Sequence, residues 1–287
     1  MRRASEINGR FFIVGSARSG TTLLQSMIAS HSRVFSFPES HFFCTAAPRG
    51  RVRGRLGIVR RPRARSAFNG LLKSLERPDL AHMFPSQSPL FRSHARSFMK
   101  VIDMVALADG EDYWVEKTPH HIDFIPLIDS VIPNAHFIHV LRDGRDVLAS
   151  QFHANNQDPE YWGNWPLPKM IGQWNSDVTI SLGYRGTPRH LVVHYEDVLQ
   201  DPEACLRRVA DFMGIEFEES MLRHWESADR VVGWRKTDPW MQKAFQPLED
   251  TRLKKFFEVF TEDQRRQIVD NLLWGGEVRR DMETPHV

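Results

Sequence analysis

The chain has 287 residues, of which 41% are hydrophobic and 26% are charged, and its formal net charge is +2. This composition is typical of a globular protein with an ample core, and two cysteines far apart argue against a disulfide framework or a cysteine-based metal site. The length favours a single domain over residues 1–287 with a basic insertion at about 45–108. We expect no membrane span and a cytoplasmic protein, because no apolar run reaches about 18 residues and the amino-terminal sequence lacks a signal-peptide core.

Five short apolar runs, each followed by a polar or turn signal, predict β-strands. They cover residues 10–15, 34–37, 113–116, 135–141 and 190–195. Helical patterns lie between them, including an apolar stripe over 22–30, a helix from Asp201 to Gly214, and one from Thr261 to Gly275-Gly276. Apolar strands that alternate with helices predict an α/β fold with a mainly parallel sheet of about five strands, flanked by helices. Ligands of such sheets bind outside the carboxyl ends of the strands.

Positive charge is concentrated between His41 and Leu75, a segment without Asp or Glu. Its nine cations are Arg49, Arg51, Arg53, Arg55, Arg60, Arg61, Arg63, Arg65 and Lys73. The segment therefore carries +9, and the remainder carries −7 because the whole chain carries +2. Such a block could recruit an acidic partner or substrate, or it is a solvated, mobile loop punctuated by glycine and proline. Short helices are expected around Leu71 and Met104.

The sequence GSARSGTT, residues 15–22, joins the first predicted strand to the first helix. Its glycine spacing is that of a phosphate-binding loop, G-x-x-x-x-G, but threonine stands at position 21, where a nucleoside triphosphatase has lysine. Backbone N–H groups at the start of a helix can bind a phosphate without a metal, and Thr21 and Thr22 add hydroxyl donors. Arg18 adds a guanidinium fork inside the loop. The loop therefore predicts a phosphate site unlike that of a triphosphatase.

A second group of polar residues follows the fourth strand, in HFIHVLRDGRDVLAS. Arg142 lies at the strand end and Ser150 eight residues later, on a helix that Asp146 is expected to begin. This pair could clamp a second phosphate group. Two alternatives stay open: Asp143 holds magnesium for a triphosphatase, or the charged residues at 142–146 only pair with each other at the surface. The missing loop lysine argues against the triphosphatase.

Four segments occur in an order that resembles the sulfotransferase superfamily. They are GSARSGTTLL, EKTP at residues 116–119, RDGRDVLAS and HYEDVLQDPEACLRRVADFMGI. Members of this superfamily use 3′-phosphoadenosine 5′-phosphosulfate (PAPS). The resemblance implies a three-layer, P-loop-like fold and transfer of a sulfuryl group to a hydroxyl acceptor, with no metal required. The spacing is closer to the tyrosylprotein and bacterial carbohydrate branches than to the aryl branch, which has tryptophan where this chain has Leu23.

By this resemblance the first loop binds the 5′-phosphosulfate and the second group binds the 3′-phosphate. The implied 5′ residues are Arg18, Ser19, Gly20, Thr21 and Thr22, and the implied 3′ residues are Arg142 and Ser150. Tyr195, within YED, is expected either to contact the adenine or only to pack, and the adjacent Glu196 is expected to be structural. Arg235 and Lys236, within GWRK, resemble a basic segment that closes over the donor, with a solvated loop as the alternative.

Sulfuryl transfer requires a base that removes the acceptor proton. Glu39 follows the second strand, in the place of the glutamate base of the tyrosylprotein branch, and a structural ion pair with an arginine is its alternative role. His41 is the rival base, because the aryl branch uses a histidine.

The reaction also requires cations that stabilise charge on the transferring group and the leaving phosphate. Lys117, after the third strand, is expected to place its ammonium over the sulfuryl group, and Arg18 is expected to share this task. An ion pair of Lys117 with Glu116 or Asp112 is the alternative.

Nothing in the sequence distinguishes a sugar hydroxyl, a phenol, a tyrosine or a lipid alcohol as acceptor, although the arginine block favours an acidic or already sulfated one. The Trp-rich stretch 161–174 could line the acceptor site or pack in the core. The histidines at 120–121, 136 and 139 do not converge, so no metal site is predicted. No nucleic-acid partner is expected. The competing functions are a P-loop kinase or triphosphatase, and a non-catalytic module that binds nucleotides or polyanions.

Overall fold

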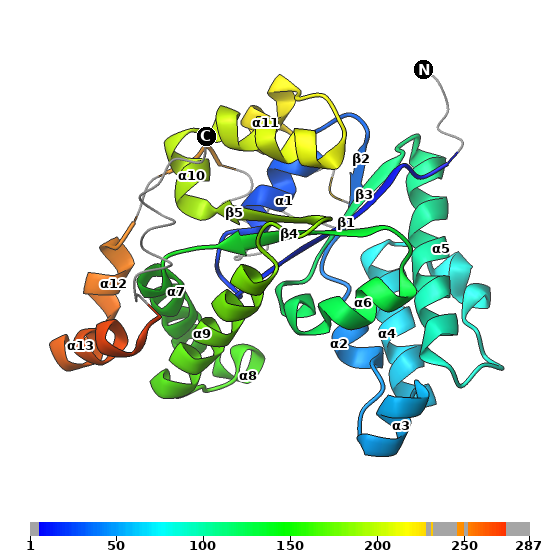
Figure 1. Cartoon of the computed structure of the whole chain (residues 1–287), viewed down its shortest axis with the longest axis horizontal. Coiled ribbons are helices and arrows are strands. Elements are labelled where there is room, and N and C mark those ends of the chain that lie inside the picture. Colours follow the sequence, from blue (N-terminus) through cyan, green and yellow to red (C-terminus); the bar gives the residue numbers. More distant parts are fainter. Residues whose placement is uncertain (1–5, 228–230, 232–245, 250–251, 274–287) are drawn as a thin grey trace.

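A five-stranded, wholly parallel sheet forms the centre of the molecule (Figure 1). The computed structural model describes residues 6–227, 231, 246–249 and 252–273. The strands are β1 (Gly9–Gly15), β2 (Val34–Ser36), β3 (Tyr113–Lys117), β4 (Ala135–Leu141) and β5 (His190–His194), in the spatial order β2-β3-β1-β4-β5. The predicted α/β class and all five predicted strands are confirmed, and no strand end differs from its prediction by more than one residue.

The central strand β1 shows why these strands are apolar on both faces. Phe11 and Ile13 pack in one core cluster, whereas Phe12 and Val14 pack in another on the opposite side of the sheet. Alternate residues of a strand point to opposite faces, so a sheet covered on both sides requires apolar residues at every position. This demand explains the continuous apolar runs in the sequence.

Helices cover both faces of the sheet in three groups. On the side of the sheet that carries Phe12 and Val14 lie α2 (Phe42–Ala46), α4 (Arg61–Ser74), η1 (Pro78–Met83), α5 (Phe91–Asp109), η2 (Pro119–Phe124) and α6 (Ile125–Val131). The short helix α3 (Arg51–Leu56) lies beyond them, at the outer edge of the molecule. The opposite face carries α1 (Thr21–Ala29), α10 (Tyr195–Gln200), α11 (Pro202–Met213) and η3 (Glu219–Glu226). A third cluster beyond the end of β4 contains α7 (Gly144–Gln157), α8 (Pro159–Trp162), α9 (Leu167–Gly183), α12 (Lys254–Val259) and α13 (Glu262–Asn271).

Local capping signals set the ends of two predicted helices. The Asp201 carboxylate accepts a hydrogen bond from the Ala204 N–H, and Gly214 ends α11 in the left-handed conformation. Thr261 forms the predicted capping box with Gln264 at the start of α13. That helix ends at Asn271, and the predicted stop at Gly275-Gly276 lies outside the described residues.

The arginine-rich segment is helical, so the interpretation of it as a mobile loop was wrong. Its arginines lie on α3, on α4 and at their ends, and the opposite face of α4 is apolar and buried. The exposed side chains are those of Arg49, Arg53, Arg55, Arg60, Arg61, Arg63 and Arg65. Phe68 and Leu71 of α4 share a core cluster with Phe98 of α5 and with Phe12 of the sheet. Burial of this apolar stripe supplies the stability that the local charge repulsion opposes. The expected helices around Leu71 and Met104 are α4 and the long helix α5.

None of the helices in the described ranges combines the length and the apolar character that crossing a bilayer requires.

Gly15, at the junction of β1 and the following loop, is predicted to be sensitive to substitution. Its φ is +150°, and a Cβ atom there would lie 2.5 Å from the carbonyl oxygen of Val140 on β4. We expect Gly15→Ala to lower the free energy of unfolding by about 2 kcal/mol or more, because the backbone of β4 cannot move without breaking the sheet. Urea denaturation measures this loss.

The matched control is Gly172→Ala within α9, where no atom lies within 4 Å of the added Cβ. This change should raise the free energy of unfolding by about 0.5–1 kcal/mol, because alanine loses less backbone entropy in a helix. Equal stabilities of the two variants would contradict the assignment of close approach at Gly15.

Candidate active site

The loop between β1 and α1 forms an uncapped helix N-terminus at the carboxyl edge of the sheet. Gly20 is the residue before α1; its φ is +93°, and it offers no side-chain cap to the first N–H groups of the helix. A Cβ at this position would lie 2.2 Å from Cδ2 of Tyr195, so only glycine permits this approach. The unbonded N–H groups and the positive end of the helix dipole together favour an anion.

Arg18 joins the two predicted phosphate-binding groups. Its backbone is in the left-handed conformation, with a φ of +74°. Its Nε atom donates a hydrogen bond to Ser150 Oγ on α7 at 3.1 Å, and its carbonyl oxygen accepts one from Arg142 Nη1 at 3.4 Å. Residues 132 and 124 positions apart in the sequence therefore meet at one place.

Two guanidinium groups lie close together in this place. Burial and then the positive charge of Arg142 lower the pKa of Arg18, while the negative charge of Glu39 raises it. Arg142 Nη2 lies 3.5 Å from Asp146 Oδ2, and its guanidinium stacks on the Tyr195 ring at 4.2 Å. Its buried Nε has no hydrogen-bond partner among the described residues. The site thus combines like charges with an unsatisfied buried donor, a combination that an oxyanion relieves.

The helix α7 begins at Gly144 with Asp143 as its N-cap, which corrects the expected start at Asp146. The Asp143 carboxylate accepts hydrogen bonds from the Arg145 N–H at 2.9 Å and from Arg145 Nη2 at 2.6 Å. Its own N–H donates to Glu196 Oε1 at 3.0 Å, which gives Glu196 the expected structural role. Asp143 therefore serves as a helix cap, and the charged residues of this turn do pair with each other, although Arg142 and Asp146 lie mostly buried rather than at the surface.

Glu39 and Lys117 contact each other at the ends of neighbouring strands. Lys117 Nζ donates to Glu39 Oε1 at 2.5 Å, and His41 Nε2 lies 3.2 Å from Glu39 Oε2. The partner of Lys117 is thus neither Glu116 nor Asp112, and the partners of Glu39 are a lysine and a histidine. A hydrogen bond with Cys44 and the Glu39 charge raise the pKa of His41 despite its partial burial. The predicted base, its rival and the predicted ammonium form one cluster.

A buried carboxylate holds the two segments that carry this cluster. Glu116 accepts hydrogen bonds from Ser40 Oγ at 2.8 Å and from Thr118 Oγ1 at 2.6 Å, next to Glu39 and Lys117 respectively. His121 Nδ1 lies 2.9 Å from its other oxygen.

Charge pairing outweighs desolvation for both members of this buried pair. Burial alone would raise the pKa of Glu116, but the charge of His121 and hydrogen bonds from it, Thr118 and Ser40 lower that pKa to about 2. Burial alone would likewise lower the pKa of His121, but the charge of Glu116 and a hydrogen bond with Cys44 raise that pKa to about 10. The sequence prediction missed this pair, whose only signal was its position inside EKTPHH.

Two further residues that sequence reasoning missed form hydrogen bonds with the loop, Gln151 with Ala17 and Asp177 with Ser16. Gln151 Nε2 donates to the carbonyl oxygen of Ala17 at 2.9 Å, one residue after Ser150 on α7. Asp177 on α9 is buried, and this burial raises its pKa to about 6. Neither residue belongs to a recognisable motif, so only the packing of α7 and α9 against the loop reveals them.

Other predicted residues take different places. Trp174 packs in the core, where its ring lies against Gly144 and its Nε1 donates to the Arg142 carbonyl oxygen at 3.3 Å. Tyr195 also packs, between Gly20 and the Arg142 guanidinium, so its contact with an adenine stays a prediction. Arg235 and Lys236 lie outside the described residues.

The histidines of β4 point to opposite faces of the sheet, as their spacing predicts. His136 stacks on Phe11 and meets Phe212 edge to face, whereas His139 contacts Ser181 and His190 on the other side. Within the ranges that the structure describes, no three His, Cys, Asp or Glu side chains gather as metal ligands, and Cys44 and Cys205 are both free thiols.

The wholly parallel sheet and the glycine loop after its central strand define a P-loop-like α/β protein. Residues 10–219 match the sequence profile of the sulfotransferase family, and the chain belongs to this family. Protein-tyrosine sulfotransferase A of Caenorhabditis elegans is 23% identical over 255 residues, which are 88% of this chain and 62% of that protein. The chain spans 34% to 62% of the length of four curated relatives that it matches.

Solved sulfotransferase structures share the fold. The sulfotransferase domain of the olefin synthase from Synechococcus PCC 7002 has a TM-score of 0.60 at 22% identity, over 94% of this chain and 96% of that one. A mouse sulfotransferase in complex with PAP has a TM-score of 0.55 at 13% identity, over 96% of this chain and 88% of that one. The three-layer sulfotransferase architecture expected from the sequence is thereby confirmed.

The Glu116–His121 pair predicts a distinctive pH dependence of stability. The Glu116 pKa is lowered, so its contribution is complete above about pH 4.5 and is lost as the pH falls towards 2. The His121 pKa is raised, so its contribution is complete below about pH 6.5 and is lost as the pH rises through 10. We expect the stability advantage of the wild type over His121→Gln to shrink between pH 6.5 and 10 in urea denaturation.

The matched control is His82→Gln, which removes an exposed histidine from η1. Its stability relative to the wild type should not vary over the same pH range. An advantage over His121→Gln that stays constant from pH 6.5 to 10 would show that His121 is not charged in the folded protein.

Proposed function

We propose that the protein transfers a sulfuryl group from PAPS to a hydroxyl acceptor. The observation that carries this proposal is the meeting of Arg18, Ser150 and Arg142 at the carboxyl edge of the sheet. An ATP-hydrolysing loop needs a lysine for the terminal phosphates, and Thr21 stands in that position. A donor with phosphate groups at both its 5′ and 3′ positions instead requires two adjoining anion sites.

The residues of the site fit such a donor. The first N–H groups of α1, the hydroxyls of Thr21 and Thr22 and the Arg18 guanidinium would hold the 5′-phosphosulfate. Arg142 and Ser150 would hold the 3′-phosphate, which would satisfy the orphaned Nε of Arg142. A mouse sulfotransferase of the same fold was solved in complex with PAP, which supports a donor of this kind.

The Glu39–Lys117 pair would perform the transfer. The acceptor oxygen attacks the sulfur atom, the bond from sulfur to the 5′-phosphate oxygen breaks, and Glu39 takes the acceptor proton. The ammonium of Lys117 and the guanidinium of Arg18 would stabilise the negative charge that passes to the leaving phosphate. The 2.5 Å contact supports this division of roles, because an acceptor hydroxyl bonded to Glu39 lies next to the ammonium.

The electrostatics favour Glu39 over His41 as the base. A raised pKa keeps His41 protonated to a higher pH, which makes it a poorer proton acceptor near neutrality. In its charged form it stabilises the neighbouring carboxylate of Glu39 through their 3.2 Å contact. His41 would therefore orient and stabilise the base.

The acceptor would carry a hydroxyl group. The curated relatives include proteins named protein-tyrosine sulfotransferases, whose acceptors are phenolic. The chain shares less than a quarter of its residues with them in alignment, so phenol, sugar and lipid alcohols are all candidate classes.

Glu39→Gln tests the base directly. The amide cannot take a proton, so we expect turnover with PAPS to fall about 100- to 10,000-fold. Binding of 3′,5′-ADP should persist, because Glu39 is not assigned to the donor. Labelled-sulfate transfer to a panel of hydroxyl acceptors measures turnover, and thermal shift measures binding: a ligand at 100 times its Kd stabilises by about 2.7 kcal/mol.

The control is Glu216→Gln, which changes an exposed carboxylate outside the site. This variant should retain both turnover with PAPS and binding of 3′,5′-ADP. Full turnover by Glu39→Gln would assign the base to another group, and preference of the wild type for ADP with magnesium over 3′,5′-ADP would overturn the sulfotransferase proposal itself.

Arg142→Ala tests the 3′-phosphate site. Loss of hydrogen bonds to a charged phosphate should weaken 3′,5′-ADP binding about 10- to 100-fold and leave 5′-AMP binding nearly unchanged. Arg142→Lys should give an intermediate loss, because lysine keeps the charge but not the planar fork. Thermal titration of both nucleotides gives the ratio.

The matched control is Arg207→Ala, which removes an exposed guanidinium from α11. It should keep the preference of the wild type for 3′,5′-ADP over 5′-AMP. An Arg142→Ala protein that keeps that preference as well would place the 3′-phosphate site elsewhere.

A further inference from the structure

The outer surface of α3 and the start of α4 carries arginines that are not neutralised locally. We call Arg53, Arg55, Arg60 and Arg63 the arginine surface. All four side chains are exposed, and the described part of the chain places no carboxylate within ion-pair distance of them. Their mutual repulsion has to be offset by solvent or by an anionic partner.

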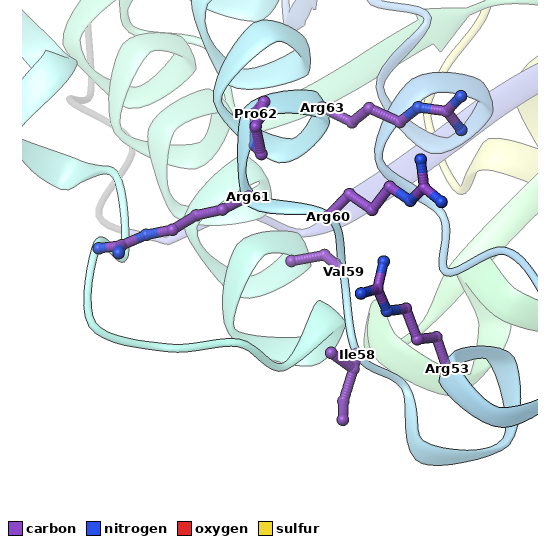
Figure 2. A pocket seen from close by; sticks show the side chains of 7 residues that line it. All are labelled: Arg53, Ile58, Val59, Arg60, Arg61, Pro62 and Arg63. Atoms are coloured by element: carbon purple, nitrogen blue, oxygen red, sulfur yellow. The ribbon is translucent and has the colours of Figure 1, made fainter.

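A hollow of about 460 Å³ lies within this surface. Figure 2 shows the guanidinium groups of Arg53, Arg60 and Arg63 on the same side of the chain, whereas Arg61 reaches to the opposite side. Ile58 and Val59 contribute apolar atoms to its lining. Three guanidinium groups on one side of a hollow offer several hydrogen-bond donors to phosphate groups.

The first turn of α4 adds to the positive potential. It contains no acidic residue, the residue before it is Arg60, and no side chain caps its N–H groups. A helix N-terminus normally attracts acidic side chains, because its dipole is positive there. At the start of α4, arginines stand where acidic side chains would stabilise the helix. This arrangement destabilises the helix start and makes the surface attractive to anions.

Two exposed aliphatic side chains accompany these charges. Val52 is 69% exposed and Leu56 is 59% exposed, and both lie on α3. Residues four apart in a helix share one side, and at about 100° per residue Arg53 and Arg55 flank this pair on either side. An apolar ridge bordered by arginines is the arrangement of helices that lie in a membrane interface.

We propose that the arginine surface and the Val52–Leu56 pair dock on an anionic lipid bilayer. Lipid phosphate groups would enter the hollow among the guanidinium groups, and the two aliphatic side chains would lie at the boundary of the acyl chains. In Figure 1, α3 lies at the outer edge of the molecule, away from the sheet, where a plane can reach it. This inference does not depend on the donor or the acceptor proposed above.

The apolar pair favours a bilayer over an acidic peptide or a nucleic acid. A hydrated polyanion pairs with the arginines but leaves Val52 and Leu56 in water, so it gains nothing from them. A bilayer offers both anionic phosphates and an apolar layer beneath them. Exposed aliphatic residues between arginines are therefore explained by a lipid surface and not by charge alone.

Co-sedimentation with vesicles of phosphatidylcholine, with and without phosphatidylserine, tests this proposal. The wild type should bind only the vesicles that contain phosphatidylserine, and less at high salt. Arg60→Gln/Arg63→Gln should weaken binding about 25-fold, since each cation near an anionic surface contributes about fivefold. Val52→Ser/Leu56→Ser should weaken vesicle binding but leave binding to heparin and polyglutamate unchanged.

Matched controls separate this site from general charge and folding effects. Arg207→Gln/Arg223→Gln removes the same charge from α11 and η3, and Val269→Ser removes an exposed aliphatic side chain from α13. Both should bind vesicles like the wild type, and thermal unfolding should show every variant folded. The proposal would be overturned if the wild type failed to bind vesicles, or if Val52→Ser/Leu56→Ser bound them as well as the wild type does. Binding to polyglutamate but not to vesicles would also overturn it, and would assign the surface to an acidic protein segment.

Discussion

The proximity of two guanidinium groups is the constraint on which the rest of the site depends. Arg18 and Arg142 repel each other, and burial adds to the cost of their charges. The protein keeps them in place by geometry: a left-handed backbone at Arg18, a hydrogen bond from its Nε to Ser150, and the stacking of Arg142 on Tyr195. The repulsion between the two positive charges is relieved when an anion binds between or beside them.

The parallel sheet makes this geometry possible. β1 and β4 are neighbours, so the loop after β1 and the turn after β4 emerge side by side at the same edge. Gly15 lies close to the backbone of β4, and Gly20 lies close to the ring of Tyr195. These two contacts prevent the loop that carries Arg18 from moving away from Arg142. The phosphate-binding geometry is therefore a consequence of the strand order as much as of the loop sequence.

A second constraint lies one strand further along the sheet. The carboxylate of Glu116 is fully buried and paired with His121, and it holds the residues adjacent to Glu39 and to Lys117. Adjacent residues of a strand point to opposite faces, so the side chains of Glu116 and Lys117 leave β3 on different sides. The Glu116 carboxylate binds Ser40, Thr118 and His121, while the Lys117 ammonium binds Glu39. Ser74, at the end of α4, reaches the Glu39 carbonyl oxygen at 3.5 Å, which connects the site to the helix that carries the arginine surface.

The five strands, the α/β class and the glycine loop at 15–22 could be predicted from the sequence alone. These features depend on local patterns, namely apolar runs, glycine spacing and helix caps, which act over a few residues. The tertiary structure was needed to show that Arg18 contacts Ser150 and Arg142, that the arginine segment is helical, and that Lys117 pairs with Glu39. It was also needed to show that Glu116, His121 and Gln151 support the site. Each of these depends on burial or on contacts across the fold: the stripe of α4 becomes helical because it packs on α2 and α5, and Glu116 keeps its charge because His121 is buried beside it. Such contacts join residues far apart in the chain, and no local pattern records them.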